Sequence, residues 1–164
     1  MRVLGVDPGT YHLGVGVVDY DDGDFRHMYS AVVSPAKSGA LPHRLAYLYE
    51  HLCDIIRQWV PDEVAIEQPF ASRNVKAAMA IGQAQAIAML VAAQSQVPVT
   101  TYPPRRIKQA VTDYGGSSKE QVQEMVAALL GGEEVFESSD EADALAVAIC
   151  HINSNRSADI VFLD

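Results

Sequence analysis

The chain opens with two apolar runs that are separated by a polar turn. Residues 3–6 and 13–18 are mainly valine, leucine and glycine, and Asp-Pro-Gly-Thr occupies 7–10. Two β-type runs split by a Pro-Gly turn predict a β-hairpin. Residues 25–34 alternate less regularly and predict a third strand at the edge of the sheet. The opening therefore predicts an antiparallel three-stranded unit.

Two long helical segments and two short strands follow. Residues 41–60 place apolar side chains on one stripe, which predicts an amphipathic helix. Residues 74–96 are rich in alanine and predict a helix with Asn74 as its N-cap. Residues 63–68 and 97–102 predict short strands, and strands that follow helices are expected to pair in parallel.

The last third of the chain is predicted to be mostly helical. Three helices are expected there: around Val111, from Ser117 or Ser118 to Leu130, and from Ser138 to about Ile152. Residues 153–164 show little pattern and are expected to form a C-terminal tail. The whole chain, 1–164, therefore predicts a single α/β domain with a mixed five-stranded sheet. An antiparallel meander forms one side of the sheet, parallel strands form the other, and helices flank both faces.

Composition excludes some classes of protein. The apolar content of 49% is ordinary for a globular domain, and the start does not resemble a secretory signal peptide. Residues 77–104 carry no charge, but their glutamines and Pro98 favour a buried helix followed by a strand over a membrane span. Cys53 and Cys150 fit no metal or redox spacing, so we expect reduced thiols and a cytoplasmic protein.

The net charge of −9 is unevenly distributed along the chain. Residues 68–112 contain five basic side chains and no acidic one, whereas residues 133–143 contain six acids. The five basic residues are Arg73, Lys76, Arg105, Arg106 and Lys108. This segregation predicts a basic face beside an acidic pocket. The alternative is a solvated acidic surface with scattered cations.

Four carboxylates stand where the predicted elements would bring them together. Asp7 and Glu67 each end a predicted strand, and parallel neighbours carry their carboxyl ends to one edge of the sheet. Asp140 and Asp143 are three residues apart and project from one face of the last helix. Each also has a structural alternative: a turn residue at 7, a buried ion pair at 67, and helix-start acids at 140 and 143.

Clustered carboxylates repel one another, and divalent cations relieve that repulsion. A site built only from carboxylate oxygens suits Mg²⁺ or Mn²⁺ rather than zinc. The sequence therefore predicts a metal site whose ligands are Asp7, Glu67, Asp140 and Asp143.

Six short motifs carry a family resemblance. They are VDPGT at 6–10, AIEQPF at 65–70, GQA at 82–84, IKQAVT at 107–112, KEQVQEMV at 119–126 and DEADALAVA at 140–148. Each is weak alone, but in this order and spacing they resemble the bacterial RuvC Holliday junction resolvases. The resemblance runs to about His151.

The resemblance implies a ribonuclease H-like fold and a homodimer. It implies an endonuclease of homologous recombination and DNA repair that nicks four-way DNA junctions symmetrically, leaving 5′-phosphate and 3′-hydroxyl ends. Two Mg²⁺ ions would serve each active site, with Mn²⁺ as a substitute. It also implies the RuvAB branch-migration complex as a partner.

The resemblance assigns roles to residues of this chain. Asp7, Glu67, Asp140 and Asp143 match the family's catalytic acids, Lys108 and Lys119 its lysines, and Phe70 its junction-facing aromatic residue. We expect Lys119 to act at the scissile phosphate and Lys108 to hold the DNA backbone. Arg73, Lys76, Arg105 and Arg106 are further candidate phosphate contacts.

Three features depart from the family pattern. Gln85 replaces an arginine, Asp113 adds a negative charge between the two lysines, and the C-terminus lacks a basic tail. With the net charge, these features predict weak and salt-sensitive DNA binding.

Three alternatives remain open at this point. They are a non-catalytic junction-binding dimer, a YqgF-type nuclease acting on RNA, and a nucleotide-binding protein related to the sugar-kinase and actin-like superfamily.

Overall fold

The structure is a computed structural model that describes residues 1–68, 74–132 and 136–161, with the backbone alone for 157–161. The elements in chain order are β1 (Arg2–Asp7), β2 (Leu13–Asp21), β3 (Asp24–Val33), α1 (Leu41–Trp59), β4 (Glu63–Glu67), α2 (Val75–Gln94), β5 (Val99–Tyr102), α3 (Pro104–Thr112), α4 (Lys119–Leu130) and α5 (Ser139–Val161).

The five strands form one mixed sheet in the order β3-β2-β1-β4-β5. The pairs β1–β2 and β2–β3 are antiparallel, while β1–β4 and β4–β5 are parallel. The predicted meander, the parallel strands and the edge position of β3 are confirmed. Because β1, β4 and β5 run in the same direction, their carboxyl ends meet at one edge, which we call the carboxyl edge.

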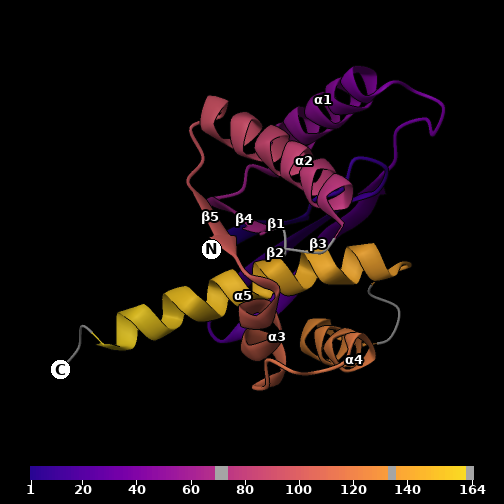
Figure 1. Cartoon of the computed structure of the whole chain (residues 1–164). Helices are drawn as coiled ribbons and strands as arrows, with labels where there is room; N and C mark the ends of the chain where they lie inside the picture. Colours follow the sequence, from indigo (N-terminus) through magenta and orange to yellow (C-terminus); the bar gives the residue numbers. More distant parts are fainter. Residues whose placement is uncertain (69–73, 133–135, 162–164) are drawn as a thin grey trace.

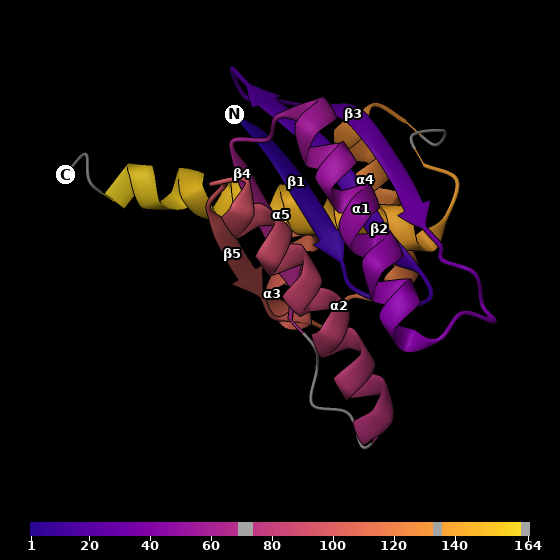
Figure 2. The ribbon, with the colours of Figure 1, turned by 90° about the horizontal axis from the view of Figure 1, so that it is seen from above.

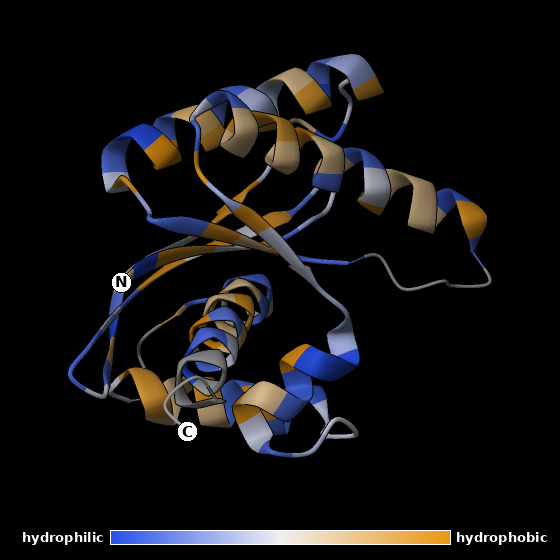
Figure 3. Cartoon of the chain, turned by 90° about the vertical axis from the view of Figure 1, so that its left-hand side faces the viewer, coloured by the Kyte–Doolittle hydropathy of each residue, from blue (hydrophilic) through white to orange (hydrophobic). Residues whose placement is uncertain are grey.

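Helices cover both faces of this sheet (Figures 1 and 2). On one face α1 and α2 pack over Leu4 and Val6 of β1, and on the other α5 packs over Val3 together with α3 and α4. The alternation along each strand produces the two cores, and Figure 3 shows apolar strands between helical layers. In β4, Val64 and Ile66 face one layer and Ala65 the other, as the sequence predicts.

Two helix starts are closed by the side chains expected there. Asn74 caps α2 by accepting a hydrogen bond from the backbone N–H of Ala77. Of the two candidate serines before α4, Ser118 is the N-cap, and it forms a reciprocal capping box with Gln121.

The last helix is longer than the sequence predicts. Instead of ending near Ile152, α5 continues to Val161, and Figure 1 shows its final turns extending past the sheet. Residues 153–156 are polar, so no apolar periodicity marks this part as helix. Side-chain hydrogen bonds anchor it instead: Asn153 donates to the carbonyl of Ala110, and Asn155 donates to Glu63. The expected tail from 153 is therefore wrong as far as 161.

The α2 helix is less buried than expected. Its buried residues are small or β-branched and lie on one side: Ala84, Ala88, Val91 and Ala92. On the opposite side, an apolar stripe with exposed Val75, Met79, Met89 and Leu90 faces outward. By length and composition, α2 is also the one helix among the described residues that could cross a membrane.

The α5 helix approaches the strands so closely that two glycines are required. A Cβ atom at Gly5 of β1 would collide with the backbone carbonyl of Ala144, and one at Gly14 of β2 would collide with that of Asp140. Both collisions are with helix backbone, which cannot yield by a change of rotamer. These glycines therefore set the distance between α5 and the sheet.

We predict that Gly5→Ala destabilises the protein by about 2–4 kcal/mol, because overpacking a core forces the backbone to shift. Urea unfolding followed by circular dichroism measures the change. Gly82→Ala in α2 is the control, since a Cβ there meets nothing within 4 Å, and it is expected to be neutral or stabilising. Equal effects of the two substitutions would contradict the prediction.

Candidate functional site

Three carboxylates converge at the carboxyl edge of the sheet. Asp7 ends β1, and Asp140 and Asp143 lie in the first turns of α5. One oxygen from each lies within 4.8 Å of the other two. Gly14 is the register partner of Asp7, and it contacts the backbone of Asp140. The close approach of helix and sheet therefore brings these acids together.

Glu67 ends β4 beside Asp7, because Val6 and Ile66 are register partners and one residue follows each. Burial raises the pKa of Glu67 to about 7, with the charge of Asp143 adding to the effect. The pKa of Asp7 is raised to about 8, mainly by burial and then by the charges of Glu67, Asp143 and Asp140. The four predicted carboxylates therefore form one electrostatically coupled site.

Lys119 is the cation in direct contact with this site. Its Nζ donates to Oδ2 of Asp143 at 2.6 Å. Burial lowers the pKa of Lys119, but the hydrogen bond to Asp143 and the nearby carboxylate charges outweigh it, so the pKa is raised. Lys119 is the first residue of α4, directly after the Ser118 cap. The capping box therefore fixes the backbone from which this lysine reaches Asp143.

Lys108 approaches the site from α3. Its Nζ donates to the backbone carbonyl of Ser117 at 2.7 Å, which ties α3 to the turn before α4. Lys108 and Lys119 line one cavity of about 190 Å³ together with Glu67 and Asp143. Its other four lining residues are apolar: Pro104, Ile107, Val122 and Ala146. The cavity is therefore lined by charged and apolar side chains in equal number.

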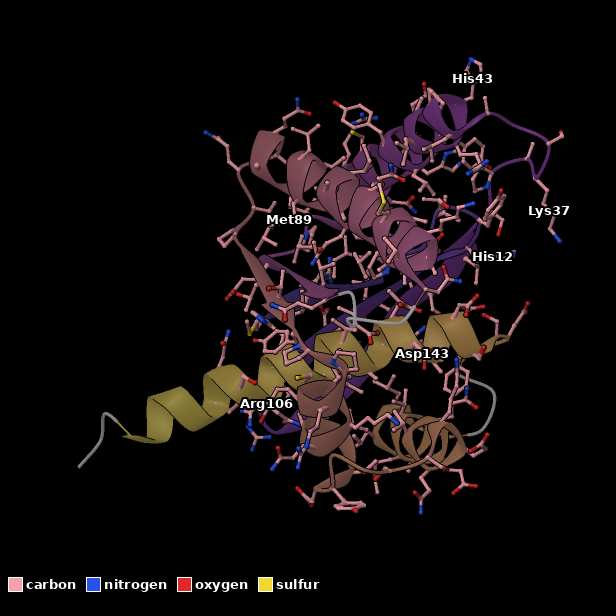
Figure 4. The ribbon with its side chains drawn as sticks, in the orientation of Figure 1. His12, Lys37, His43, Met89, Arg106 and Asp143 are labelled. Carbon is pink, nitrogen blue, oxygen red and sulfur yellow. The ribbon has the colours of Figure 1, made fainter. Side chains whose placement is uncertain are left out.

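The remaining predicted DNA contacts either do not line this cavity or lie outside the described residues. Arg106 lines a separate cavity with Asn153 and Arg156, and Figure 4 shows it well apart from Asp143. Arg105 is exposed and packs beside Gly115. Lys76 is exposed in the first turn of α2. Phe70 and Arg73 lie outside the described residues.

The donor atoms fit a hard divalent cation. Asp7, Asp140 and Asp143 each offer an oxygen within 4.8 Å of the other two, and Glu67 on the neighbouring strand is coupled to them by its charge. Carboxylate oxygens are the ligands that Mg²⁺ and Mn²⁺ prefer. Burial, together with the neighbouring carboxylates, raises the pKa values of Asp7 and Glu67 despite the nearby Lys119. A divalent cation would supply the missing positive charge.

One acid beside these ligands does not join them. Glu141 follows Asp140, but it is only 8% exposed and turns away from the cluster. Its carboxylate accepts hydrogen bonds from Ser30 of β3 and Ser138 before α5. The spacing of Ser138 and Glu141 is that of a capping box, a signal present in the sequence. Nothing local in the sequence marks Ser30 as its partner.

We predict that the metal-free protein loses stability as the pH rises. A carboxyl group whose pKa is raised by folding stabilises the native state. This contribution is complete at pH values below the pKa of the group in the unfolded chain, which is near 4. That contribution disappears as the pH passes the folded values of about 7 and 8. Between pH 5 and pH 8.5 we expect a loss on the order of 2–4 kcal/mol in urea unfolding.

Asp7→Asn is the control for this prediction, because asparagine cannot titrate and also removes one repelling charge. The free energy of unfolding of the variant is expected to change much less with pH. In the wild type, Mg²⁺ is expected to restore the stability that is lost at pH 8.5. Identical profiles for the wild type and the variant would contradict the assignment.

Comparison with known proteins identifies the family. Residues 3–151 match the family model described as crossover junction endodeoxyribonuclease RuvC. A protein of that name from Dehalococcoides mccartyi is 48% identical over 160 residues, covering 98% of this chain and 97% of the relative. One from Chloroflexus aggregans is 45% identical over 151 residues, covering 92% of each.

Among solved structures, Thermus thermophilus RuvC in complex with Holliday junction substrate superposes with a TM-score of 0.91. Its sequence is 33% identical, and the match covers 96% of both chains. The fold is therefore the ribonuclease H-like fold of RuvC structures, as the sequence predicts. From the family match, the full-length relatives and this structural agreement, the chain belongs to the RuvC family of crossover junction endodeoxyribonucleases.

Proposed function

We propose that this protein is a Holliday junction resolvase: a cytoplasmic endonuclease that nicks two strands of a four-way DNA junction symmetrically during homologous recombination and repair. The products are expected to carry 5′-phosphate and 3′-hydroxyl ends. The observation that carries the proposal is the coupled group of Asp7, Glu67, Asp140 and Asp143 in a chain of this family. The Thermus thermophilus relative contains junction DNA, which supports the same substrate here.

The four carboxylates would hold two Mg²⁺ ions, with Mn²⁺ as a substitute. When bound, such ions activate water and stabilise negative charge on the leaving oxygen. Asp7 lies between Glu67 and the two aspartates of α5, so it is our candidate for the ligand shared by both ions. The rigid strand and helix that carry these acids keep the ligand geometry fixed before the substrate arrives.

The two lysines would position the DNA. Lys119 is 49% exposed and can release Asp143 to contact the scissile phosphate once a cation neutralises that carboxylate. Lys108, which lines the same cavity, would contact a neighbouring phosphate. Phe70 would stack on a base at the crossover. Arg73, Lys76, Arg105 and Arg106 are proposed as outer phosphate contacts that add affinity without touching the reaction.

The protein would act as a homodimer. A four-way junction has approximate two-fold symmetry, so a two-fold dimer places two active sites on two strands. The exposed apolar stripe of α2 supports this arrangement, with Val75 67%, Met79 60% and Leu90 47% exposed in the single chain. Pairing of two such stripes would bury this surface. The RuvAB branch-migration complex is proposed as a partner on family membership alone.

We predict that Asp7→Asn retains binding to a labelled four-way junction but lowers its cleavage by at least about a hundredfold. Loss of a hydrogen-bond partner of a metal ligand already reduces activity about 10–100-fold, and loss of the ligand itself should reduce activity more. Gel-based cleavage and binding assays on a junction and a matched linear duplex measure the two effects.

Asp54→Asn is the matched control, because Asp54 is an exposed aspartate paired only with Arg57 in α1. It is expected to cleave like the wild type. Cleavage by Asp7→Asn at the wild-type rate, or equal cleavage of the linear duplex, would overturn the proposed function.

We predict that the double variant Met79→Glu, Leu90→Glu converts the protein from a dimer to a single chain of 17.8 kDa. The two residues lie on the same stripe, so both charges would be forced into the paired interface. Light scattering after size exclusion gives the mass. Met125→Glu, an exposed methionine on α4, is the control. A wild-type protein that is a single chain in solution, or that partitions into lipid vesicles, would refute this use of α2.

A further inference from the structure

Glu141 is a buried acid that stands among metal ligands without joining them. It is 8% exposed, one residue after Asp140 and two before Asp143. Oxygen atoms of both neighbours group with Asp7, whereas Glu141 is outside that group. A buried carboxylate must be satisfied by hydrogen bonds, and Glu141 accepts two from hydroxyl groups. Its carboxylate therefore makes its hydrogen bonds outside the group of Asp7, Asp140 and Asp143.

The two contacts connect the start of α5 to the edge strand. Oε2 of Glu141 accepts from Oγ of Ser30 at 2.7 Å, and Oε1 accepts from Oγ of Ser138 at 3.0 Å. The backbone N–H of Glu141 in turn donates to Oγ of Ser138, which closes the N-cap of the helix. In a capping box the acid would reach back to the backbone N–H of the cap residue. Here the acid reaches across to β3 instead.

A third residue completes the network. Nε2 of His27 lies 3.1 Å from Oγ of Ser30. Because the hydroxyl proton of Ser30 is directed at the Glu141 carboxylate, its oxygen accepts from the imidazole N–H. His27 and Ser30 both belong to β3, which pairs only with β2 among the described strands. The two hydrogen bonds, from His27 to Ser30 and from Ser30 to Glu141, therefore fix the side-chain rotamer of Ser30 and its contact with α5.

We propose that the Ser30–Glu141 contact is a positioning device for the metal ligands of α5. When ionised, Asp7, Asp140 and Asp143 repel one another, and this repulsion would push the first turn of α5 away from the sheet. The backbone N–H groups of a first helical turn also have no partners within the helix. The bond from Ser30 of β3 holds this turn against the sheet. Ser30 and Glu141 touch neither cation nor substrate, so they act through Asp140 and Asp143. The proposal rests on the proposed function.

The test is Mn²⁺ binding by the full-length protein, measured by titration calorimetry without DNA. Ser30→Ala is expected to weaken binding by about tenfold, the lower end of the loss that follows removal of a direct hydrogen-bond partner of a metal ligand, because Ser30 acts on the ligands only through Glu141 and the helix. Glu141→Ala should match or exceed this loss. Glu141→Gln should stay within about threefold of wild type, because its amide can accept from one hydroxyl and donate to the other.

Ser154→Ala is the matched control, since Ser154 lies on the same helix and donates to the carbonyl of Cys150. It is expected to leave Mn²⁺ binding unchanged. A second measurement is junction cleavage against Mg²⁺ concentration. Ser30→Ala should require more Mg²⁺ for half-maximal rate yet approach the wild-type rate at saturation, because all four ligands remain. A lower melting temperature with unchanged metal dependence would reveal a merely structural role and overturn the proposal.

The outcomes separate this proposal from the proposed function. A wild-type protein that binds Mn²⁺ and cuts junctions, with Ser30→Ala indistinguishable from it, would refute the positioning role alone. A wild-type protein that neither binds Mn²⁺ nor cuts junctions would refute the proposed function. If Glu141→Ala does not fold, Ser30→Ala still decides the question, because it removes a single hydroxyl from an edge strand.

Discussion

The site depends on how closely the backbone of α5 can approach strands β1 and β2. At Gly5 and Gly14 the helix backbone occupies the space that a Cβ atom would need. A side chain at either position would move the first turns of α5 outward and carry Asp140 and Asp143 away from Asp7. The same contact buries Val3 against Leu145 and Ile149, so the packing that stabilises this layer also assembles the acids. Fold and site share one structural constraint here.

That contact gathers negative charge that the metal-free protein does not fully neutralise. Lys119 pairs with Asp143, yet the pKa values of Asp7 and Glu67 stay raised by burial and by the neighbouring carboxylates. Replacing one of these acids with a neutral residue would relieve their repulsion. The four acids together therefore oppose stability, and such conflicts between local chemistry and stability concentrate at functional sites. The Ser30–Glu141 contact opposes the same repulsion from outside the cluster.

The fold and the four acids could be predicted because each follows a local rule. The alternation along residues 63–68 predicts which side chains of β4 share a face, and the turn at 7–10 predicts the hairpin. Other features depend on distant partners. The helix after Ile152 is held by polar contacts to Glu63 and Ala110, which leave no periodic pattern. The exposure of Met79 on α2 depends on which side α1 and the sheet cover. The partnership of Glu141 with Ser30 spans 111 positions, so it becomes visible only in the structure.

The net charge of −9 does not prevent the binding of a nucleic acid, because some of the acidic residues lie at the end of the sheet opposite to the carboxylate site. Asp21, Asp22 and Asp24 surround the β2–β3 turn, and this turn lies at the amino end of β1 because Arg2 and Asp19 are register partners. The strand β1 separates Arg2 at that end from Asp7 by about 17 Å, at roughly 3.3 Å per residue. At physiological salt the Debye length is about 8 Å, so these acids are largely screened from the site. Among the described residues, DNA at the carboxyl edge would meet Lys108, Lys119 and the carboxylates, and a bound cation would neutralise much of the negative charge of these carboxylates.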